Sequence, residues 1–310
     1  MELTTMEPVG QSGRHYLIER IIQERGLSHR VYLASAGNQK FILKEVLQSN
    51  LEYFQDIHHR LQSCQYLRVS QDTIPEPSMF VYEYFTDDLL SLAQKDLPLT
   101  VTKRILKDTL RGLAAMHDQN IVHTDVKPNN ILVEYEHKDS EVVIKRVQLG
   151  DIEDAAYVPP ECDIVGKQVG NWMWRSPEAH TQGRVNKPSD IFSFGIVCIY
   201  AVLKRVIFAI DDSELGEDEP LAVLLERQIS YFADTDGLDG FLEYLGDSPW
   251  REVIEVLRDG FGERNPRRPF SLWQNVDPDF KDLIGGLMNF DPAKRLTAHE
   301  ALTHRWFRDV

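Results

Sequence analysis

The sequence predicts an α+β protein in which strands dominate the first part of the chain and helices the rest. Residues 16–46 alternate in the manner of strands, in three segments separated by turn-rich polar stretches, which indicates an antiparallel meander. Residues 100–119 carry apolar side chains at helical spacing and predict a long amphipathic helix. The length of 310 residues is enough for one large domain or for two lobes with their own cores.

Hydrophobic residues make up 42% and charged residues 27% of the chain, which is ordinary for a soluble globular protein. The net charge of −15 argues against nonspecific binding to nucleic acid or to an anionic membrane. The first ten residues lack the features of a signal peptide, and the longest apolar run, 191–203, is too short to span a bilayer. Three widely spaced cysteines show neither a disulfide framework nor metal-ligand spacing, so we expect an intracellular setting, cytoplasmic or nuclear.

Residues 121–132, I-V-H-T-D-V-K-P-N-N-I-L, form a short polar loop bracketed by apolar pairs, which predicts strand-like segments on both sides. Within it stand Asp125, Lys127 and Asn130, and Pro128 stiffens the backbone between them. Phosphoryl transfer needs a carboxylate that orients a hydroxyl nucleophile, an ammonium that neutralises phosphate, and a carboxamide that helps hold a metal ion. The alternative interpretation is a polar surface turn, because Asp, Pro and Asn are common turn formers.

The stretch H-T-D-V-K-P-N-N resembles the catalytic loop of eukaryotic protein kinases, whose usual form is H-R-D-L-K-P-x-N. A Lys at the position of Lys127 is the form that resembles serine/threonine kinases. The resemblance implies a two-lobed α+β fold, with a small β-rich N-lobe carrying one helix (about 14–84) and a larger helical C-lobe (about 85–307), after an N-terminal extension (1–13). It also implies ATP and Mg²⁺ as ligands and a protein as the second substrate.

Carried over position by position, the resemblance assigns roles to the loop residues. Asp125 becomes the catalytic base, Asn130 a magnesium ligand, and Lys127 the residue that reaches the transferring phosphate. His123 supports the loop structurally, and Leu132, just after the loop, lies against the nucleotide.

The third predicted strand resembles the strand that carries the phosphate-binding lysine of the family. F-I-L-K at 41–44 stands where the family has V-A-I-K, so Lys44 is the candidate contact to the α- and β-phosphates. Ile42 replaces a small Ala over the adenine ring, and it either fills the core or narrows the pocket.

The glycine-rich loop of the family is degenerate here. Before Val31, itself a nucleotide contact by resemblance, only Gly26 of three expected glycines is present, and Glu24 and His29 occupy the other two positions. Glycines let backbone N–H groups approach phosphates closely, and a Glu adds negative charge near them. This departure disfavours tight ATP binding.

Residues 50–67 carry apolar side chains at helical intervals, and Asn50 is placed to cap the start of this helix. The resemblance implies that the helix supplies the acidic partner of Lys44. Glu52 and Asp56, one turn apart, are both candidates, and both are equally consistent with solvent-exposed helix acids.

Residues 79–85 resemble the last small-lobe strand running into the hinge between the lobes. By register, Tyr82 guards the back of the nucleotide pocket. Glu83 and Tyr84 offer backbone groups to adenine, and Asp88 reaches the ribose.

Residues 133–150 predict two strands around a polar tip, and the second strand leads to Asp151, where the family has the Asp of D-F-G. By resemblance, Asp151 chelates the magnesium ion that bridges the β- and γ-phosphates. Glu153 replaces the glycine of D-F-G, and it either stiffens this switch or points into solvent.

Thr124 replaces the Arg that in many kinases pairs with an activation-loop phosphate, so control by activation-loop phosphorylation is not expected. Farther on, G-N-W-M-W-R-S-P-E resembles the family's G-T-x-x-Y-x-A-P-E, which makes Glu178 a structural anchor with Arg295 as its partner. Asn171 takes the place of a Thr that bonds the catalytic Asp and Lys. Asp190 belongs to a predicted buried helix and holds the backbone of the catalytic loop.

The sequence favours an ATP-dependent protein serine/threonine kinase, because it keeps at family spacing the charged and amide groups that the chemistry needs: Lys44, Asp125, Lys127, Asn130 and Asp151. The alternative is a pseudokinase, a nucleotide-sensing or scaffold module, which the departures around the nucleotide favour. A small-molecule phosphotransferase of related fold is a third class. It is disfavoured because the R-S-P-E segment resembles a platform for protein substrates.

Overall fold

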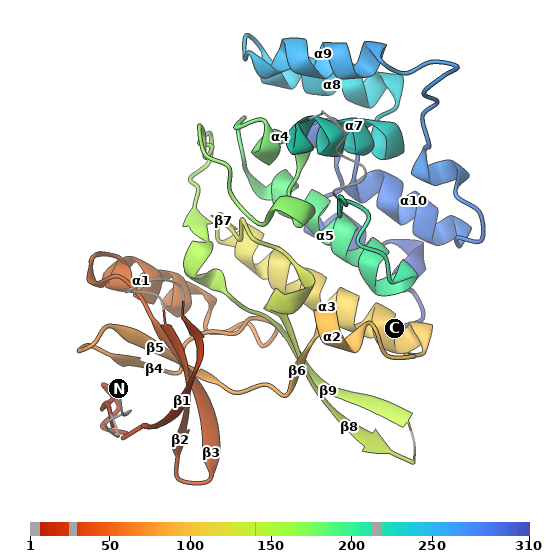
Figure 1. Cartoon of the computed structure of the whole chain (residues 1–310). Coiled ribbons are helices and arrows are strands. Elements are labelled where there is room, and N and C mark those ends of the chain that lie inside the picture. Colours follow the sequence, from red (N-terminus) through yellow and green to blue (C-terminus); the bar gives the residue numbers. More distant parts are fainter. Residues whose placement is uncertain (1–6, 25–29, 140, 212–218) are drawn as a thin grey trace.

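The computed structural model describes residues 7–24, 30–139, 141–211 and 219–310, and it has two lobes (Figure 1). In the smaller lobe the helix α1 (Leu51–Leu61) accompanies a five-stranded antiparallel sheet of order β1-β2-β3-β5-β4. The strands are β1 (Leu17–Glu24), β2 (Arg30–Ala36), β3 (Gln39–Glu45), β4 (Asp72–Ile74) and β5 (Met79–Glu83). The predicted meander over 16–46 is confirmed as β1, β2 and β3.

Side chains alternate along β3 and give the sheet two different faces. On one face Phe41 and Leu43 join Val81 of β5 in a small apolar core. Ile42 and Lys44 alternate with these residues, so they point to the opposite face, toward the larger lobe. The period of the strand therefore places the ammonium of Lys44 between the lobes.

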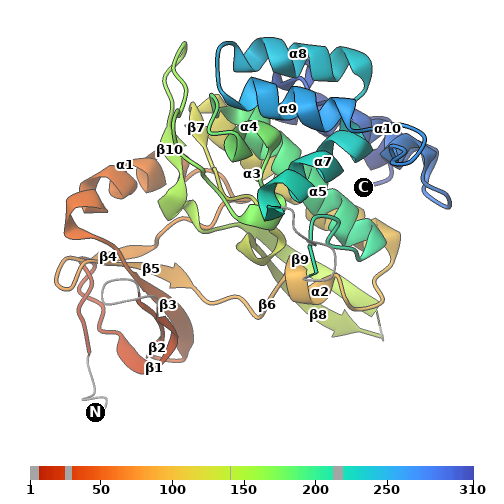
Figure 2. The same cartoon turned by 45° about the horizontal axis from the view of Figure 1, so that its top comes forward.

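Helices make up most of the larger lobe (Figure 2). They are α2 (Leu89–Leu92), α3 (Leu99–Asp118), α4 (Pro177–His180), α5 (Lys187–Leu203), α7 (Pro220–Phe232), α8 (Thr235–Leu245), α9 (Trp250–Asp259), α10 (Pro278–Leu287) and α11 (Ala298–Leu302). Helix α5 lies at the centre, and its residues are buried from Ser189 to Ala201. Helix α3 matches the amphipathic helix predicted over 100–119. None of the described helices combines the length with the apolar character that crossing a bilayer needs.

Two small sheets complete the larger lobe and position its polar loops. One contains β6 (Asp87–Asp88), β8 (Ile131–Lys138) and β9 (Glu141–Leu149), and the other pairs β7 (Ile121–Val122) with β10 (Ala156–Tyr157). Ile131 lies opposite Leu149 in the antiparallel β8–β9 pair. The loop that precedes β8 and the turn that follows β9 are therefore neighbours, and the backbone N–H of Gly150 donates to the carbonyl of Asn130 at 2.8 Å.

Helix α1 is shorter than the sequence predicts. It ends at Leu61 rather than near residue 67, and its last turn is followed by a loop that leads to β4. Asn50 stands just before the helix, but its side chain accepts no capping hydrogen bond, so the predicted cap is wrong. The apolar residues that face the core are Leu51, Phe54, Ile57 and Leu61.

A buried ion pair joins helix α4 to the C-terminal part of the chain. The guanidinium of Arg295 donates to both carboxylate oxygens of Glu178, at 2.5 and 2.9 Å, and neither side chain is more than 1% exposed. Arg295 also donates to the carbonyls of Asn289 and Pro188. The pair is fully hydrogen-bonded, which is the condition under which a buried pair persists.

We expect Arg295→Met to lower the free energy of unfolding by about 3–5 kcal/mol, because the Glu178 carboxylate is then buried without its partner. Urea denaturation followed by circular dichroism measures this change. As a control, Lys145→Met breaks the exposed pair with Glu136 and leaves the denaturation midpoint nearly unchanged. An Arg295 variant as stable as the Lys145 variant would contradict the structural role of the pair.

Candidate active site

A cavity of about 430 Å³ lies between the sheet of the smaller lobe and the polar loops of the larger lobe. This volume is in the range of small-molecule sites. Its lining includes residues that the sequence singles out, namely Val31, Ile42, Lys44, Tyr82, Lys127, Asn130, Leu132, Asp151 and Glu153. It also includes Arg68 and Asp154, which the sequence analysis did not select.

The loop between β7 and β8 is held by its own polar side chains. Lys127 Nζ donates to Asp125 Oδ2 at 2.5 Å, and Asn130 Nδ2 donates to the Asp125 carbonyl at 2.9 Å. A single 3₁₀ turn, Pro128–Asn130, fixes the backbone between these residues. The backbone N–H of Asn171 donates to the other carboxylate oxygen of Asp125 at 2.8 Å, so here the residue at the family's Thr position contributes its backbone. The side-chain oxygen of Asn171 instead accepts from the N–H of Met173.

Helix α5 fixes the start of this loop through one buried carboxylate. Asp190 accepts from the backbone N–H of His123 at 2.7 Å and from that of Thr124 at 2.9 Å. The ring of His123 bonds the Gly150 carbonyl at 2.9 Å, and the hydroxyl of Thr124 donates to the Asp154 carbonyl at 2.9 Å. These contacts tie the loop to the turn at 151–154.

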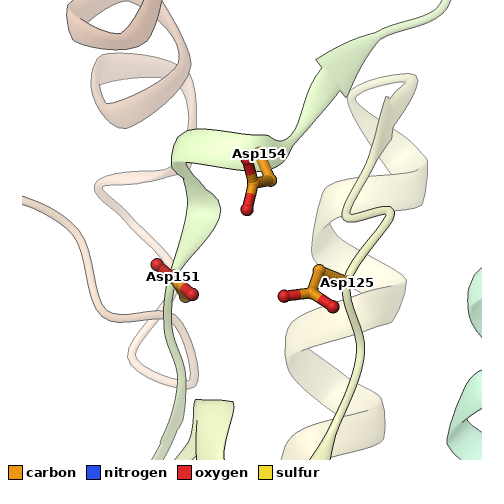
Figure 3. A group of neighbouring side chains, drawn as sticks. All are labelled: Asp125, Asp151 and Asp154. Carbon is orange, nitrogen blue, oxygen red and sulfur yellow. The ribbon is translucent and has the colours of Figure 1, made fainter. Parts of the chain in front are cut away.

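Three acidic side chains lie close together at the turn formed by residues 151–154: Asp151 and Asp154 of the turn itself, and Asp125 of the preceding loop. Asp151 has left-handed backbone angles, φ 63° and ψ 45°, and is followed by a single 3₁₀ turn, Ile152–Asp154. Carboxylate oxygens of Asp125, Asp151 and Asp154 lie within 4.8 Å of one another, and Figure 3 shows them directed toward a shared space. Oxygen donors in such a group suit Mg²⁺. Asp154 was missed by sequence analysis, although the run D-I-E-D carries the signal.

Lys44 sets the ionisation of this turn. Its ammonium hydrogen-bonds Asp151 Oδ1 and, at 2.9 Å, Glu153 Oε2. Burial by itself raises the pKa of Asp151, but the adjacent Lys44 lowers this pKa below its ordinary value. Burial likewise lowers the pKa of Lys44, yet the carboxylates of Glu153 and Asp151 together hold it above its ordinary value. All three groups are therefore charged at neutral pH.

Burial and the neighbouring Asp151 raise the pKa of Asp154, and the attraction of Lys44 only partly offsets this rise. A cation in the shared space would reverse this effect.

A sequence profile described as "Protein kinase domain" matches residues 30–307. The chain belongs to the protein kinase family. It is 27% identical over 307 residues to cyclin-dependent kinase 4 of Xenopus laevis, covering 96% of this chain and 84% of that protein. It is 30% identical over 237 residues to cell division control protein 2 homolog 3 of Trypanosoma brucei brucei, covering 74% and 68%. It is 22% identical over 311 residues to human dual specificity tyrosine-phosphorylation-regulated kinase 3, covering 94% of this chain and 49% of that protein.

The acid that pairs with Lys44 in this kinase is not on α1. Glu52 is exposed, and Asp56 pairs with Arg60 at 2.6 Å on the solvent side of the helix. Both candidates are wrong because the face of α1 that packs inward is occupied by apolar residues at the helical period. Glu153 pairs with Lys44 instead, and with a side chain only 8% exposed it does not point into solvent.

The degenerate glycine-rich loop is described only in part. Gly26 and His29 lie outside the described residues. The carboxylate of Glu24 accepts from Arg30 Nε at 2.7 Å and is half exposed, so its charge is paired.

The residues predicted to contact the base and ribose do not line the cavity with their side chains, and the backbone contact expected of Glu83 and Tyr84 stays a prediction. The carboxylate of Glu83 pairs with Arg146, and Tyr84 is exposed. Asp88 accepts from the backbone N–H of Ser91 at 2.9 Å and so caps α2. None of the three predicted residues is among the described residues that line the cavity.

Arg68 occupies the base end of the cavity and was missed by sequence analysis, which contained no signal for it. Its guanidinium donates to the Glu83 carbonyl, from Nη2 at 2.5 Å and from Nε at 3.2 Å, and lies 4.9 Å from the centre of the Tyr82 ring. Its stem packs against Gly150. Burial lowers the pKa of Arg68 to about 10, so it stays charged at neutral pH.

We expect Asp151→Asn to remove the Mg²⁺-dependent part of nucleotide binding and to weaken Mg·ATP by roughly tenfold or more, because one carboxylate of the oxygen group is lost. The measurement is the rise in melting temperature with ATP, in the presence of Mg²⁺ or a chelator. Asn tolerates left-handed backbone angles, so the turn is kept.

Asp139→Asn is a matched control, because Asp139 is also left-handed, φ 50°, but lies at the far tip of the β8–β9 hairpin. If Mg²⁺ increases the ATP-dependent rise in melting temperature equally in wild type and in Asp151→Asn, then Asp151 is not a metal ligand.

Proposed function

We propose that this protein is an ATP-dependent protein serine/threonine kinase, which transfers the γ-phosphoryl group of ATP to a hydroxyl of a protein substrate. One observation carries the proposal. Lys44, Lys127, Asn130 and Asp151 line a single cavity, and the carboxylate of Asp125 lies within 4.8 Å of that of Asp151. Charged and amide groups from three separate segments meet where phosphoryl transfer would use them.

Each group has a chemical task in the proposed reaction. Asp125 accepts a hydrogen bond from the substrate hydroxyl and takes its proton as the new P–O bond forms and the bond to ADP breaks. Lys127, already 2.5 Å from Asp125, offsets negative charge on the moving phosphoryl group. Lys44 orients the α- and β-phosphates.

A bound Mg²⁺ would supply positive charge that offsets the charge of the phosphates. Asp151, Asn130 and Asp154 are the residues that would hold it. The amide nitrogen of Asn130 is used by the loop backbone, and its amide oxygen makes no hydrogen bond with the described residues. The oxygen-only donor set fits this ion.

Membership of the family supports the serine/threonine class, a protein substrate and an intracellular setting in this proposal. Lys127 stands in the form of the catalytic loop found in serine/threonine kinases. The matched relatives are named as cyclin-dependent and dual-specificity kinases. We take the N-lobe as about 14–84 and the C-lobe as about 85–307, within an intracellular protein that binds neither nucleic acid nor membrane.

Activation-loop phosphorylation is not required in this proposal. Thr124 has no charge with which to bind a phosphate, and its hydroxyl instead donates to the Asp154 carbonyl at 2.9 Å. This neutral hydrogen bond joins the catalytic loop to the 151–154 turn without a modification.

The second candidate is a pseudokinase that senses nucleotide or acts as a scaffold. The hydrogen bonds from Arg68 to the Glu83 carbonyl favour it, because they engage a carbonyl that the adenine amino group needs. Ile42 lies at the cavity wall, where a side chain larger than the family's Ala would leave less room for the adenine ring.

We expect wild-type protein to transfer labelled γ-phosphate to a general protein substrate, and Asp125→Asn to lose this activity by about 10²–10⁴-fold, because the proton acceptor is removed. Mg·ATP binding, measured by the rise in melting temperature, is retained in the variant. Activity unchanged in Asp125→Asn would overturn the assignment. Binding of Mg·ATP by wild type without any transfer would favour the pseudokinase.

We expect Arg68→Met to tighten Mg·ATP binding by roughly tenfold, since it frees the Glu83 carbonyl for the adenine amino group while keeping the unbranched stem against Gly150. Isothermal titration calorimetry measures the change. Purine riboside triphosphate, which lacks the amino group, is the matched control and gains nothing. An equal rise in affinity for the two nucleotides would show that Arg68 hinders binding by its size and not by occupying the Glu83 carbonyl.

A further inference from the structure

Glu153 is buried at the centre of a chain of hydrogen bonds that ends on Lys44. One carboxylate oxygen accepts from Lys44 Nζ at 2.9 Å, and the other accepts from the Tyr82 hydroxyl. The Tyr82 oxygen in turn lies 3.0 Å from His58 Nε2, and His58 Nδ1 accepts from the Ser70 N–H. The chain runs from α1 through β5 to the 151–154 turn and ends on β3.

The protonation states of His58 and Tyr82 determine which group donates and which accepts in each of these hydrogen bonds. Burial lowers the pKa of His58 to about 4, so the ring is neutral, accepts at Nδ1 and donates from Nε2 to Tyr82. Burial raises the pKa of Tyr82, so its hydroxyl stays protonated and donates to Glu153. Each carboxylate oxygen of Glu153 faces a hydrogen-bond donor, Lys44 Nζ on one side and the Tyr82 hydroxyl on the other. Glu153 is therefore a carboxylate with both oxygens engaged.

In kinases generally, the phosphate-binding lysine must pair with an acid on the small-lobe helix while the metal-binding Asp is in place, and the position of that helix controls activity. In this kinase α1 presents Phe54 to the cavity, while Glu52 and Asp56 face solvent. The acid stands two residues after Asp151 instead. One four-residue turn thus carries both the partner of Lys44 and a metal-site carboxylate.

Building on the proposed function, we infer that Glu153 is the positioning residue for Lys44, in place of an acid on α1, so that formation of the 151–154 turn alone prepares the phosphate-binding lysine. Within the part of the chain that the structure describes, the hydrogen bonds that link helix α1 to Glu153 run through the neutral His58 and Tyr82. Movement of α1 does not break the ion pair of Lys44.

The test compares Glu153→Gln with Glu52→Gln and Asp56→Asn, measuring the KM for Mg·ATP, kcat and the affinity for Mg·ATP. We expect Glu153→Gln to lower kcat/KM for ATP by about 10–100-fold, with a higher KM, because a neutral amide no longer holds the ammonium. The two α1 variants stay within twofold of wild type. Glu153→Asp, which keeps the charge, recovers part of the loss.

A double-mutant cycle separates positioning from a merely structural effect. In a Lys44→Met background Glu153→Gln should change Mg·ATP affinity less than twofold, because the group it positions is absent. An equal loss in both backgrounds would overturn the proposal. So would tighter nucleotide binding in Glu153→Gln, which would mean that Glu153 competes with the phosphates for Lys44.

Failure of the proposed function gives a different result. If wild type binds Mg·ATP but transfers nothing, the kinase proposal fails, and a weaker affinity in Glu153→Gln still supports the role of Glu153. If wild type transfers phosphate and Glu153→Gln does so equally well, only the role of Glu153 is lost. If wild type binds no Mg·ATP, both are overturned.

Discussion

The site depends on one electrostatic constraint, the placement of the Lys44 ammonium between two carboxylates in the space between the lobes. Burial disfavours the charge on each of these groups, and the attraction between Lys44 and the two carboxylates is the largest effect that keeps them ionised. Lys44 belongs to the sheet of the smaller lobe, whereas Asp151 and Glu153 belong to the larger lobe. The ion pairs therefore hold the lobes in register at the point where phosphate charge is to be neutralised, and that registration is a condition for any transfer.

The other polar groups of the site are positioned by the β8–β9 pair and by helix α5, through a small number of hydrogen bonds. The antiparallel register of β8 and β9 places Asn130 beside Gly150, and one carboxylate of α5, Asp190, fixes the backbone at the start of the catalytic loop. Because α5 is buried along most of its length, this anchor is rigid. Asp125 is then held from both sides, by Lys127 and by the backbone of Asn171. The polar groups are thus fixed before any ligand arrives, which is what electrostatic catalysis requires.

Sequence reasoning predicted the elements whose pattern is local. The period of the meander, the amphipathic helix α3 and the turn chemistry of the catalytic loop are all encoded within short windows. Lys44 and Asp151 were selected by their positions relative to the family's motifs, and both line the cavity. It failed for the partner of Lys44, because the partner of a charge is decided by three-dimensional proximity and the expected helix acids point outward. Arg68 was missed because a long side chain reaches the cavity from a loop whose sequence carries no pattern.

Two departures from the family pattern explain each other physically. The family's glycine at position 153 is useful where the backbone needs freedom, yet the positive φ of this turn falls on Asp151 and not on Glu153. A side chain at 153 is therefore sterically permitted, and a carboxylate there reaches Lys44. With Lys44 already satisfied, an acid on the inward face of α1 would be a second buried negative charge without a cation, at a cost of several kcal/mol. Phe54 at that face avoids the cost and packs into the core. The missing glycine and the missing helix acid thus concern the same contact, because the carboxylate that meets Lys44 comes from the turn and not from the helix.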